Sequence, residues 1–203
     1  MSKYPPLSEM DFCPDPFTQF GQWYNLHQSD SIEIPNSFSL GTASAEGRVS
    51  LRTVLLKGYD DSGFTFFTNY NSRKFLDLSG NHMSAMLFYW QECKRQIRIE
   101  GPVIKLSEEE SEMYFVSRPR ESQLSAWASE QSSVIPDRQY LEKRYESFKS
   151  RFNGMAVQRP PYWGGLKLLP DRFEFWQDGD FRLHDRISYT KLNSLWKIER
   201  LAP

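Results

Sequence analysis

The sequence contains little that could bind a metal ion or build a disulfide framework. Its 203 residues include two cysteines, Cys13 and Cys93, and three histidines, His27, His82 and His184. None of these residues has the short spacing of zinc ligands, and two cysteines so far apart do not make a disulfide framework. The sequence therefore predicts a reduced protein without a metal site.

The chain also lacks a charge excess and a long apolar run. Lys and Arg number 25 and Asp and Glu 26, which gives a formal net charge of −1. Nucleic-acid-binding proteins usually carry a basic excess, so that class is disfavoured and any anion site must be local. No apolar run approaches the roughly 20 residues of a membrane span, and the start, MSKYPPLSEMDF, lacks the apolar core of a signal peptide. We expect a soluble, cytoplasmic protein that binds neither nucleic acid nor a membrane.

Two glycine motifs for phosphate binding are absent as well. The sequence has no G-x-G-x-x-G and no G-x-x-x-x-G-K-[ST], which disfavours Rossmann and P-loop folds. Helical and strand patterns do not alternate as they do in a parallel α/β protein. Their order is a helix, a β-meander, a helix, a β-hairpin, several helices and a second β-meander. This order indicates an α+β fold with an antiparallel barrel and helices packed outside it, formed by residues 15–203 after a mobile arm over residues 1–14.

Capping signals mark where two of the helices begin. In residues 15–28, Asp15 can cap the helix and Pro16 suits its first position. Four aromatic residues of this helix share one face, which we interpret as core: Phe17, Phe20, Trp23 and Tyr24. Ser107 and Glu110 have the spacing of a capping box at the start of a later helix. Further helices are expected over 71–81 and 136–152, and strands over 37–44, 49–59, 64–69, 84–90, 95–106, 166–177, 181–190 and 195–203.

Cations and hydroxyl groups gather at two places early in the chain. Arg52 and Lys57 lie on the strand predicted over 49–59. The second group lies where a strand passes into a helix, and consists of Thr68, Ser72, Arg73 and Lys74. A helix N-terminus offers free N–H groups to an anion, and adjacent cations add charge.

Two more groups follow later in the chain. Tyr114, Arg118 and Ser122 are spaced by four residues, so they share a helical face if the helix continues through Pro119. In the stretch RLHDR, three residues alternate and would share one face of a strand: Arg182, His184 and Arg186. That face fits an exposed edge strand as well as it fits a ligand site.

Taken together, the clusters predict two anion sites. Two separate basic sites suit two phosphates, and an aromatic content of 15% permits flat rings between them. The missing pyrophosphate fingerprint favours a mononucleotide such as FMN over FAD or NAD. A small β-barrel that binds single-stranded nucleic acid is a second hypothesis, which the net charge disfavours.

Long segments of the chain resemble the pyridoxine (pyridoxamine) 5′-phosphate oxidase family. They run in order from about Asp15 to Pro203 and read RTVLLKGYDDSGFTFFTNYNSRK, RQIRIEG, YFVSRPRESQLSAWASEQSS, WGG, EFWQ, RLHDR and WKIERLAP. The resemblance implies a six-stranded antiparallel split barrel and a homodimer with two FMN molecules at the subunit interface. It also implies oxidation of pyridoxine or pyridoxamine 5′-phosphate to pyridoxal 5′-phosphate, with O2 as acceptor and H2O2 released. The protein would then be a flavin-dependent oxidoreductase acting on CH–NH2 and CH–OH donors.

The resemblance also implies a role for individual residues. The expected FMN contacts are Arg52, Lys57, Phe67, Thr68, Arg73, Lys74, Gln96, Gln131, Ser132, Trp176 and Arg186. The substrate phosphate is expected at Lys57, Tyr114, Arg118 and Ser122. Arg182 and His184 are expected to contact the pyridine ring of the substrate and to act as the catalytic residues.

A few positions depart from the family pattern. Val116 stands where the family commonly has His, Ser125 and Asp178 where Gly is usual, and Phe67 where Tyr is frequent. An alternative is a flavin-binding split-barrel protein without this oxidase activity. Such a protein would keep RTVLLK and SRK but lose Tyr114, Arg118, Ser122 and RLH. Both sets are present, which favours the enzyme.

Overall fold

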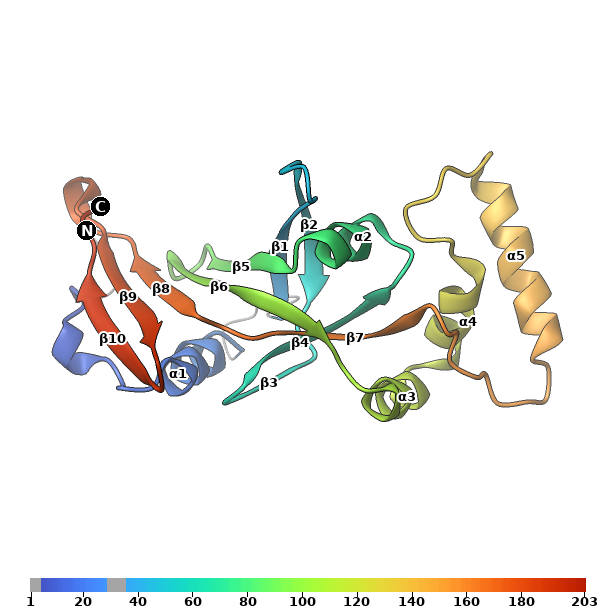
Figure 1. Cartoon of the computed structure of the whole chain (residues 1–203), viewed down its shortest axis with the longest axis horizontal. Helices are drawn as coiled ribbons and strands as arrows, with labels where there is room; N and C mark the ends of the chain where they lie inside the picture. The colour runs from blue at the N-terminus through green and yellow to red at the C-terminus, as the bar shows by residue number, and fades with distance from the viewer. Residues whose placement is uncertain (1–4, 29–35) are drawn as a thin grey trace.

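The structure is a computed structural model that describes residues 5–28 and 36–203. The molecule is elongated, with β7 running along its middle (Figure 1). The helices are α1 (Pro16–Gln28), α2 (Arg73–Gly80), α3 (Glu108–Ser117), α4 (Arg120–Ala128) and α5 (Arg138–Arg151), with 3-10 turns η1 (Glu9–Asp11) and η2 (Asp180–Arg182). Helices α3–α5 lie at one end, and α1, β8–β10 and both termini lie at the other.

All strand pairs of the described chain are antiparallel. The strands are β1 (Ser37–Ala43), β2 (Val49–Leu55), β3 (Gly58–Asp60), β4 (Gly63–Asn69), β5 (Met83–Trp90), β6 (Arg95–Lys105), β7 (Trp163–Leu168), β8 (Arg172–Gln177), β9 (Asp185–Leu192) and β10 (Leu195–Arg200). The main path is β10-β9-β8-β6-β5-β1-β2, and β6 also pairs with β7, β7 with β4, and β4 with β3. The long strand β6 therefore joins the two halves of the sheet, and the expected antiparallel split barrel with flanking helices is confirmed.

Two predicted strands are each divided, so the described sheet has ten strand segments. The strand predicted over 49–59 breaks at Leu56 and Lys57, because Leu56 N–H donates to Asn36 while Lys57 N–H donates to Thr65 of another strand. The strand predicted over 166–177 breaks around Pro170, which has no N–H for a ladder.

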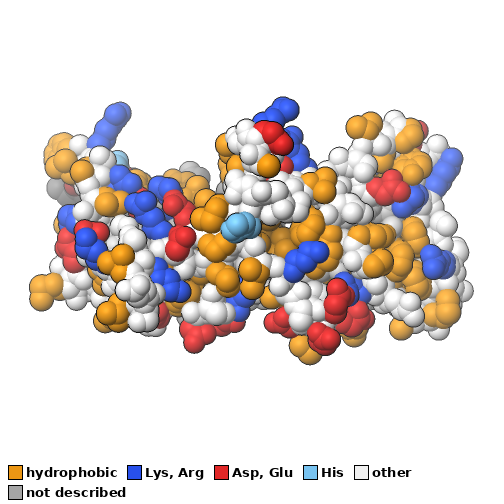
Figure 2. Space-filling view, in the orientation of Figure 1, with side chains coloured by type: hydrophobic (Ala, Val, Ile, Leu, Met, Phe, Trp, Pro, Cys, Tyr) orange, Lys and Arg blue, Asp and Glu red, His pale blue; other side chains and the backbone are white. Residues whose placement is uncertain are grey.

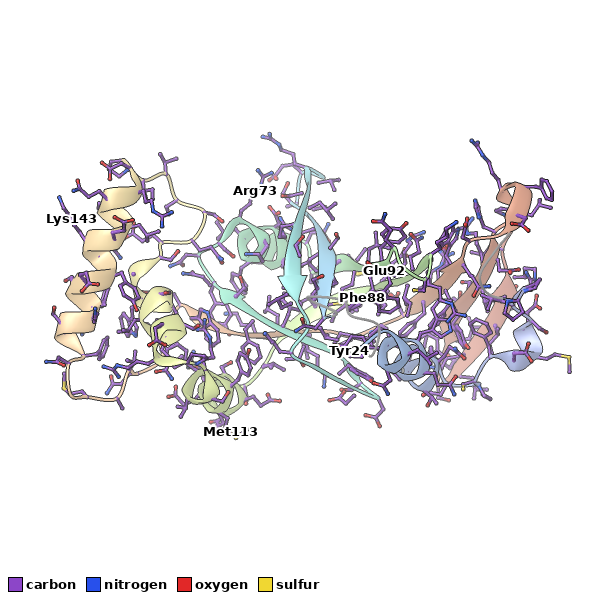
Figure 3. The ribbon with its side chains drawn as sticks, turned by 180° about the vertical axis from the view of Figure 1, so that it is seen from behind. Tyr24, Arg73, Phe88, Glu92, Met113 and Lys143 are labelled. Atoms are coloured by element: carbon purple, nitrogen blue, oxygen red, sulfur yellow. The ribbon has the colours of Figure 1, made fainter. Side chains whose placement is uncertain are left out.

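The main core forms between the sheet and α1. Phe20 is fully buried and contacts Phe64 and Phe88 at ring-centroid distances of 4.8 and 5.3 Å. Tyr24 meets Phe88 edge-on at 6.5 Å (Figure 3). The apolar face of this helix is therefore core, as predicted, and Asp15 caps it by accepting from Thr18 N–H at 2.8 Å.

The helix that begins at Ser107 is shorter than its pattern suggested. The capping box of Ser107 and Glu110 is present, but α3 ends at Ser117. Arg118 has an extended backbone and Pro119 caps α4, because proline disfavours the helical conformation of the residue before it. The expectation of a single helical face carrying Tyr114, Arg118 and Ser122 is therefore wrong.

The stretch RLHDR is not a single strand either. Arg182 ends the turn η2, with Phe181 and Arg182 at φ of 57° and 64°, and β9 begins only at Asp185. The turn can close tightly because Gly179 has no side chain. A Cβ at this position would collide with the carbonyl oxygen of Leu183. Alternation therefore does not apply across Arg182 to Arg186, and the expected shared strand face is wrong.

The described part of the N-terminal arm contacts β8–β10. Gln177 Nε2 donates to Pro5 O at 2.8 Å, and Leu7 N–H donates to Asp185 Oδ2 at 2.9 Å. The mobility expected for residues 1–14 stays a prediction, and residues 1–4 lie outside the described residues. Among the described helices, none is long and apolar enough to cross a membrane.

Candidate functional site

A pocket of about 350 Å³ lies between β2, β4, β7 and the α3–α4 helices. Side chains from five segments line it: Thr53, Val54, Leu55, Lys57, Phe67, Thr68, Asn69, Lys74, Tyr114, Arg118, Ser125, Ala126, Ser129, Gln131 and Trp163. Figure 2 shows hydrophobic side chains with Lys and Arg among them over this region, while Asp and Glu gather over α3. We call it the central pocket.

Three stacked rings form one wall of the central pocket. Phe67 stacks on Tyr114 at 3.8 Å and on Trp163 at 5.3 Å. Strand β7 can pack this closely because Gly165 has no side chain: a Cβ there would lie 2.9 Å from the Phe67 ring. Gly165 N–H also donates to Ser111 of α3 at 3.1 Å. The WGG segment therefore fixes the distance between β4, β7 and α3.

Arg118 carries a half-buried charge that no carboxylate of the described residues neutralises. Its guanidinium lies 4.5 Å from the ring centre of Trp163, and its Nη1 is buried without a hydrogen-bond partner. Burial lowers the pKa of Arg118. A desolvated guanidinium with an unused donor at a pocket wall is suited to bind an anion.

Lys74, in the first turn of α2, is a second cation without a carboxylate partner among residues 5–28 and 36–203. Its Nζ donates to Thr68 Oγ1 at 3.1 Å, Gln131 Oε1 at 3.2 Å and Ser72 Oγ at 3.3 Å. Burial, and then the positive charge of Arg52, lower the pKa of Lys74 to about 8. An entering anion would supply the charge that these neutral partners do not.

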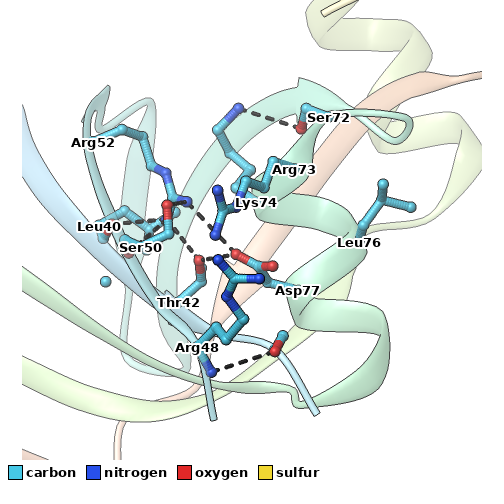
Figure 4. Close-up of polar contacts among 12 residues, drawn as sticks. Leu40, Thr42, Arg48, Ser50, Arg52, Ser72, Arg73, Lys74, Leu76 and Asp77 are labelled. Atoms are coloured by element: carbon cyan, nitrogen blue, oxygen red, sulfur yellow. Dashed lines mark hydrogen bonds and ion pairs between the residues drawn. The ribbon is translucent and has the colours of Figure 1, made fainter. Parts of the chain in front are cut away.

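Arg52 lies beside Lys74 but is partly neutralised (Figure 4). It donates to Thr42 Oγ1 at 2.7 Å and to Ser50 Oγ at 2.8 Å, and its Nη2 lies 3.7 Å from Asp77 Oδ2. Burial lowers the pKa of Arg52, while Asp77 opposes this shift. Arg52 is therefore anchored between β1, β2 and α2.

The loop after α4 closes over the start of α2. Gln131 Oε1 accepts from Thr68 Oγ1 at 3.2 Å as well as from Lys74. Ser132, with φ of 74°, accepts from Arg73 N–H at 3.2 Å. The EQSS segment is therefore tied to the helix N-terminus where the sequence predicted an anion site.

Lys57 and Ser122 differ in their relation to the pocket. Lys57 is exposed and lines it from the connection between β2 and β3. Ser122 lies in the first turn of α4 and is not among the lining residues. The substrate-phosphate set is thus brought together except for Ser122.

The remaining predicted residues form a second group on β6, β8 and β9. Gln96 is opposite Trp176, and Trp176 is opposite Arg186. Arg186 Nε and Nη2 donate to the two carboxylate oxygens of Glu174 at 2.9 and 3.0 Å, and its Nη1 donates to Ala202 O at 2.8 Å. The hydrogen bonds to Glu174 raise the pKa of Arg186. We call Gln96, Trp176, His184 and Arg186 the C-terminal cluster.

His184 and Arg182 lie at the edge of this cluster. The His184 ring centre is 4.9 Å from that of Trp176. Arg182 is exposed, and the described chain offers it no hydrogen bond or ion pair. Figure 1 places β8 and β9 at one end of the molecule and α3–α4 at the other. A single chain therefore does not join the C-terminal cluster to the central pocket.

Several residues of the site carried no assigned role in the sequence analysis. Trp163 supports Arg118, Asp77 pairs with Arg52, and Asn69 Nδ2 donates to Ser129 O at 3.4 Å in the pocket wall. Only Asp77 could have been noticed from its sequence neighbours, because it follows Arg73 by one helical turn and could form an ion pair along the helix. The others depend on contacts between distant segments.

Comparisons with known proteins agree on the family. A family model described as pyridoxamine 5′-phosphate oxidase matches residues 27–152, and one described as the pyridoxine 5′-phosphate oxidase C-terminal dimerisation region matches residues 163–203. A pyridoxine/pyridoxamine 5′-phosphate oxidase of Cupriavidus taiwanensis is 50% identical over 198 residues, covering 97% of this chain and 93% of the relative. One of Nostoc punctiforme is 47% identical over 198 residues, covering 97% and 92%.

Solved structures agree on the fold. PhzG from Burkholderia lata, crystallised with tetrahydrophenazine-1-carboxylic acid, is similar with a TM-score of 0.93 and 30% identity, covering 100% of this chain and 99% of that chain. An FMN-binding protein of Nostoc punctiforme, related to pyridoxamine 5′-phosphate oxidase, has a TM-score of 0.72 at 17% identity, covering 96% and 100%. The chain belongs to the pyridoxine/pyridoxamine 5′-phosphate oxidase family.

Proposed function

We propose that this protein is an FMN-dependent oxidase that converts pyridoxine or pyridoxamine 5′-phosphate to pyridoxal 5′-phosphate. The observation that carries the proposal is the pair of half-buried cations in the central pocket, Lys74 and Arg118. Neither has a carboxylate partner in the part of the chain that the structure describes. Two such cations in one pocket fit two phosphorylated ligands.

The residues around α2 fit the phosphate of FMN. Arg73 and Lys74 stand in the first turn of the helix, where the helix dipole favours an anion. Thr68, Gln131 and Ser132 would orient the donors around that phosphate, and Arg52 would add charge from β2. Bound FMN would supply the hydride acceptor and return the electrons to O2.

Arg118, Tyr114 and Lys57 would hold the phosphate of the substrate. All three line the central pocket, and the stack of Phe67, Tyr114 and Trp163 gives that end a rigid wall. A phosphate held away from the reacting carbon is a handle whose binding energy orients the rest of the substrate. Ser122 does not line this pocket, and its contact with the same phosphate is expected from the family resemblance alone.

The C-terminal cluster would complete the site from a second copy of the chain. One chain keeps this cluster away from its own central pocket, and the matched C-terminal model describes a dimerisation region. Strand β2, which contributes to the pocket wall, is an edge strand with exposed Val49 and Leu51 that a second copy could cover. We therefore propose a homodimer in which Gln96, Trp176 and Arg186 of one subunit reach the flavin bound by the other.

Arg182 and His184 would then contact the pyridine ring. Arg182 has an exposed guanidinium that can stack on a flat ring, and His184 can exchange a hydrogen bond with a ring substituent. The alcohol substrate would lose two hydrogens to O2 and give the aldehyde and H2O2. The amine would also consume water and release ammonia. The residues named here bind and orient the substrate and hold or accept its protons.

The test is to incubate the yellow, FMN-loaded protein with each phosphorylated substrate in air. We expect pyridoxal 5′-phosphate and H2O2 to form in equal amounts, and Arg118→Met to lose most of the activity at saturating FMN and limiting substrate. Tetrahydrophenazine-1-carboxylic acid is tested beside them as an alternative ligand, because the similar PhzG was crystallised with it. Bound flavin without turnover of either phosphate would favour a flavin-binding protein of other function.

Subunit mixing tests the shared site separately. Arg118→Met and His184→Gln would each inactivate one half of every site in a homodimer. Hybrids of the two variants would contain one intact site and one doubly damaged site, so activity should reappear on mixing. If mixing restores nothing although hybrids form, each site is built within one chain.

A further inference from the structure

Asp178, which stands where the resembling family usually has Gly, makes contacts that bear on His184. Its Oδ1 lies 3.2 Å from His184 Nδ1, and its Oδ2 lies 3.0 Å from Lys94 Nζ. Lys94 comes from the turn between β5 and β6, while Asp178 follows β8. The carboxylate thus connects that turn to the imidazole.

A second group competes for the same ring nitrogen. Gly179 N–H donates a hydrogen bond to His184 Nδ1 at 3.2 Å, while Asp178 Oδ1 lies at the same distance as an ion-pair contact. The nitrogen carries either a lone pair in the ring plane or a hydrogen there. With a lone pair it accepts from Gly179, and with a hydrogen it donates to Asp178. It cannot do both.

The charge on Asp178 decides between these arrangements. Its hydrogen bond with Lys94 lowers the pKa of Asp178, and the nearby His184 acts in the same direction, so the group is an ionised acceptor near neutral pH. A hydrogen bond to a carboxylate is stronger than one between neutral groups. Lys94 also lies within electrostatic range of Tyr89 and Asp180, but the carboxylate that contacts the imidazole is that of Asp178.

The surrounding loop holds the imidazole in place. The Trp176 ring packs against it at 4.9 Å with an interplanar angle of 44°. The close approach of Gly179 to Leu183 and the left-handed Phe181 and Arg182 fix the path of the chain. The side chain of His184 is still 25% exposed, so a ligand can reach the ring.

We infer that Asp178 is a positioning residue that places the imidazole hydrogen of His184 on Nδ1 and so leaves Nε2 as an acceptor. Without Asp178, Nδ1 would accept from Gly179 N–H and Nε2 would carry the hydrogen. The consequence for catalysis rests on the function proposed above. There, His184 would accept a hydrogen bond or a proton from a substituent of the pyridine ring, and would not donate one.

The test reads the histidine ring nitrogens directly. Two-bond 1H–15N spectra of the labelled, FMN-loaded protein at about pH 8.5, where an ordinary imidazole is neutral, distinguish the two tautomers. The chain has three histidines, and His184→Gln assigns the signals of the relevant one. We expect hydrogen on Nδ1 in the parent protein and on Nε2 in Asp178→Ala.

Lys94→Gln is the matched control, since it removes a charge from the same contact without removing the carboxylate. It should keep the hydrogen on Nδ1. The inference is overturned if the parent carries the hydrogen on Nε2, if Asp178→Ala leaves the pattern unchanged, or if Lys94→Gln reverses it equally.

Kinetics give a second reading that depends on the proposed function. Asp178→Ala should lower kcat about tenfold with KM little changed, less than the 10²–10⁴-fold typical of losing an acid–base group. A tautomer change without any oxidase activity in the parent would uphold the role of Asp178 and refute the proposed reaction. Oxidase activity with no tautomer change would do the reverse.

Discussion

Two arginines of this molecule, Arg118 in the central pocket and Arg186 in the C-terminal cluster, have opposite surroundings. Arg118 lies on Trp163 with a buried Nη1 that has no partner, and burial lowers its pKa. Arg186 donates two hydrogen bonds to the buried carboxylate of Glu174, which raises its pKa. The resemblance assigns both to ligands, yet within the described residues a carboxylate neutralises only Arg186.

The difference separates two uses of a cation. A buried charge without a partner destabilises the fold, and removing one member of a buried pair destabilises it as well. Arg118 therefore lowers the stability of the ligand-free protein, and an anionic ligand would reverse that cost. Arg186 stabilises the sheet by joining β8, β9 and the C-terminal residues, whether or not it also contacts a flavin.

The largest change in stability is expected from Arg186→Met. The substitution leaves Glu174 buried with Arg98 as its remaining cation, so the free energy of unfolding should fall by about 2–3 kcal/mol. Urea denaturation of the FMN-free protein measures this. Glu174→Gln in the same chain should restore part of the loss, because the uncompensated charge is then gone.

Arg118→Met should change stability in the other direction. Replacing this half-buried guanidinium, whose buried Nη1 has no partner among the described residues, by an apolar side chain should raise the free energy of unfolding by about 1 kcal/mol. The same variant should bind substrate more weakly by about 2–3 kcal/mol, seen as a higher KM. If Arg118→Met were destabilised as much as Arg186→Met, the contrast between the two arginines would be refuted.

How much of this contrast the sequence could predict depends on how local each feature is. Helix α1 and the capping box of α3 follow from short patterns, and so does the group of cations at the start of α2. Their structural signals lie within one or two helical turns of the residue concerned. Each was predicted correctly because no distant contact was needed.

The partners of the charges could not be predicted in this way. Glu174 meets Arg186 only across the β8–β9 ladder, and Trp163 reaches Arg118 only because β7 packs beside α3. The path of RLHDR likewise depends on the close approach of Gly179 to Leu183. Residue type and spacing located the cations, while the tertiary structure decided which of them are neutralised.

Lys74 is a third cation for this comparison, and its contribution to stability should depend on pH. Its pKa is about 8 in the folded, ligand-free protein against 10.5 in the unfolded chain. Between these values the unfolded chain binds more protons, so stability should rise by about 1 kcal/mol as the pH increases from about 8 to about 10.5. Lys74→Met should lack this rise, and the difference between the two proteins isolates it from other titrations.

FMN affinity should also depend on the protonation of Lys74, but it should fall with rising pH where stability rises. A phosphate favours the ammonium form, so the affinity of the parent protein should fall as the pH rises above about 8, and Lys74→Arg should remove this dependence because arginine stays charged. Titration of FMN into the apo-proteins measures it. A parent affinity that is flat across this range would mean that Lys74 does not meet the phosphate.

The smallest change in stability is expected at Arg182, which has neither the unpartnered burial of Arg118 nor the carboxylate of Arg186. Its side chain is exposed and makes no hydrogen bond or ion pair within the described chain, so Arg182→Ala should alter the free energy of unfolding by less than about 0.5 kcal/mol. Bound FMN should also stay, since we assign the guanidinium to the pyridine ring. KM for the substrate should rise, and kcat should fall with it where orientation is lost. Arg186→Ala, measured beside it, should instead lower stability and loosen FMN. If both variants lose stability and FMN to the same degree, the two arginines act alike and the division of roles within RLHDR is refuted.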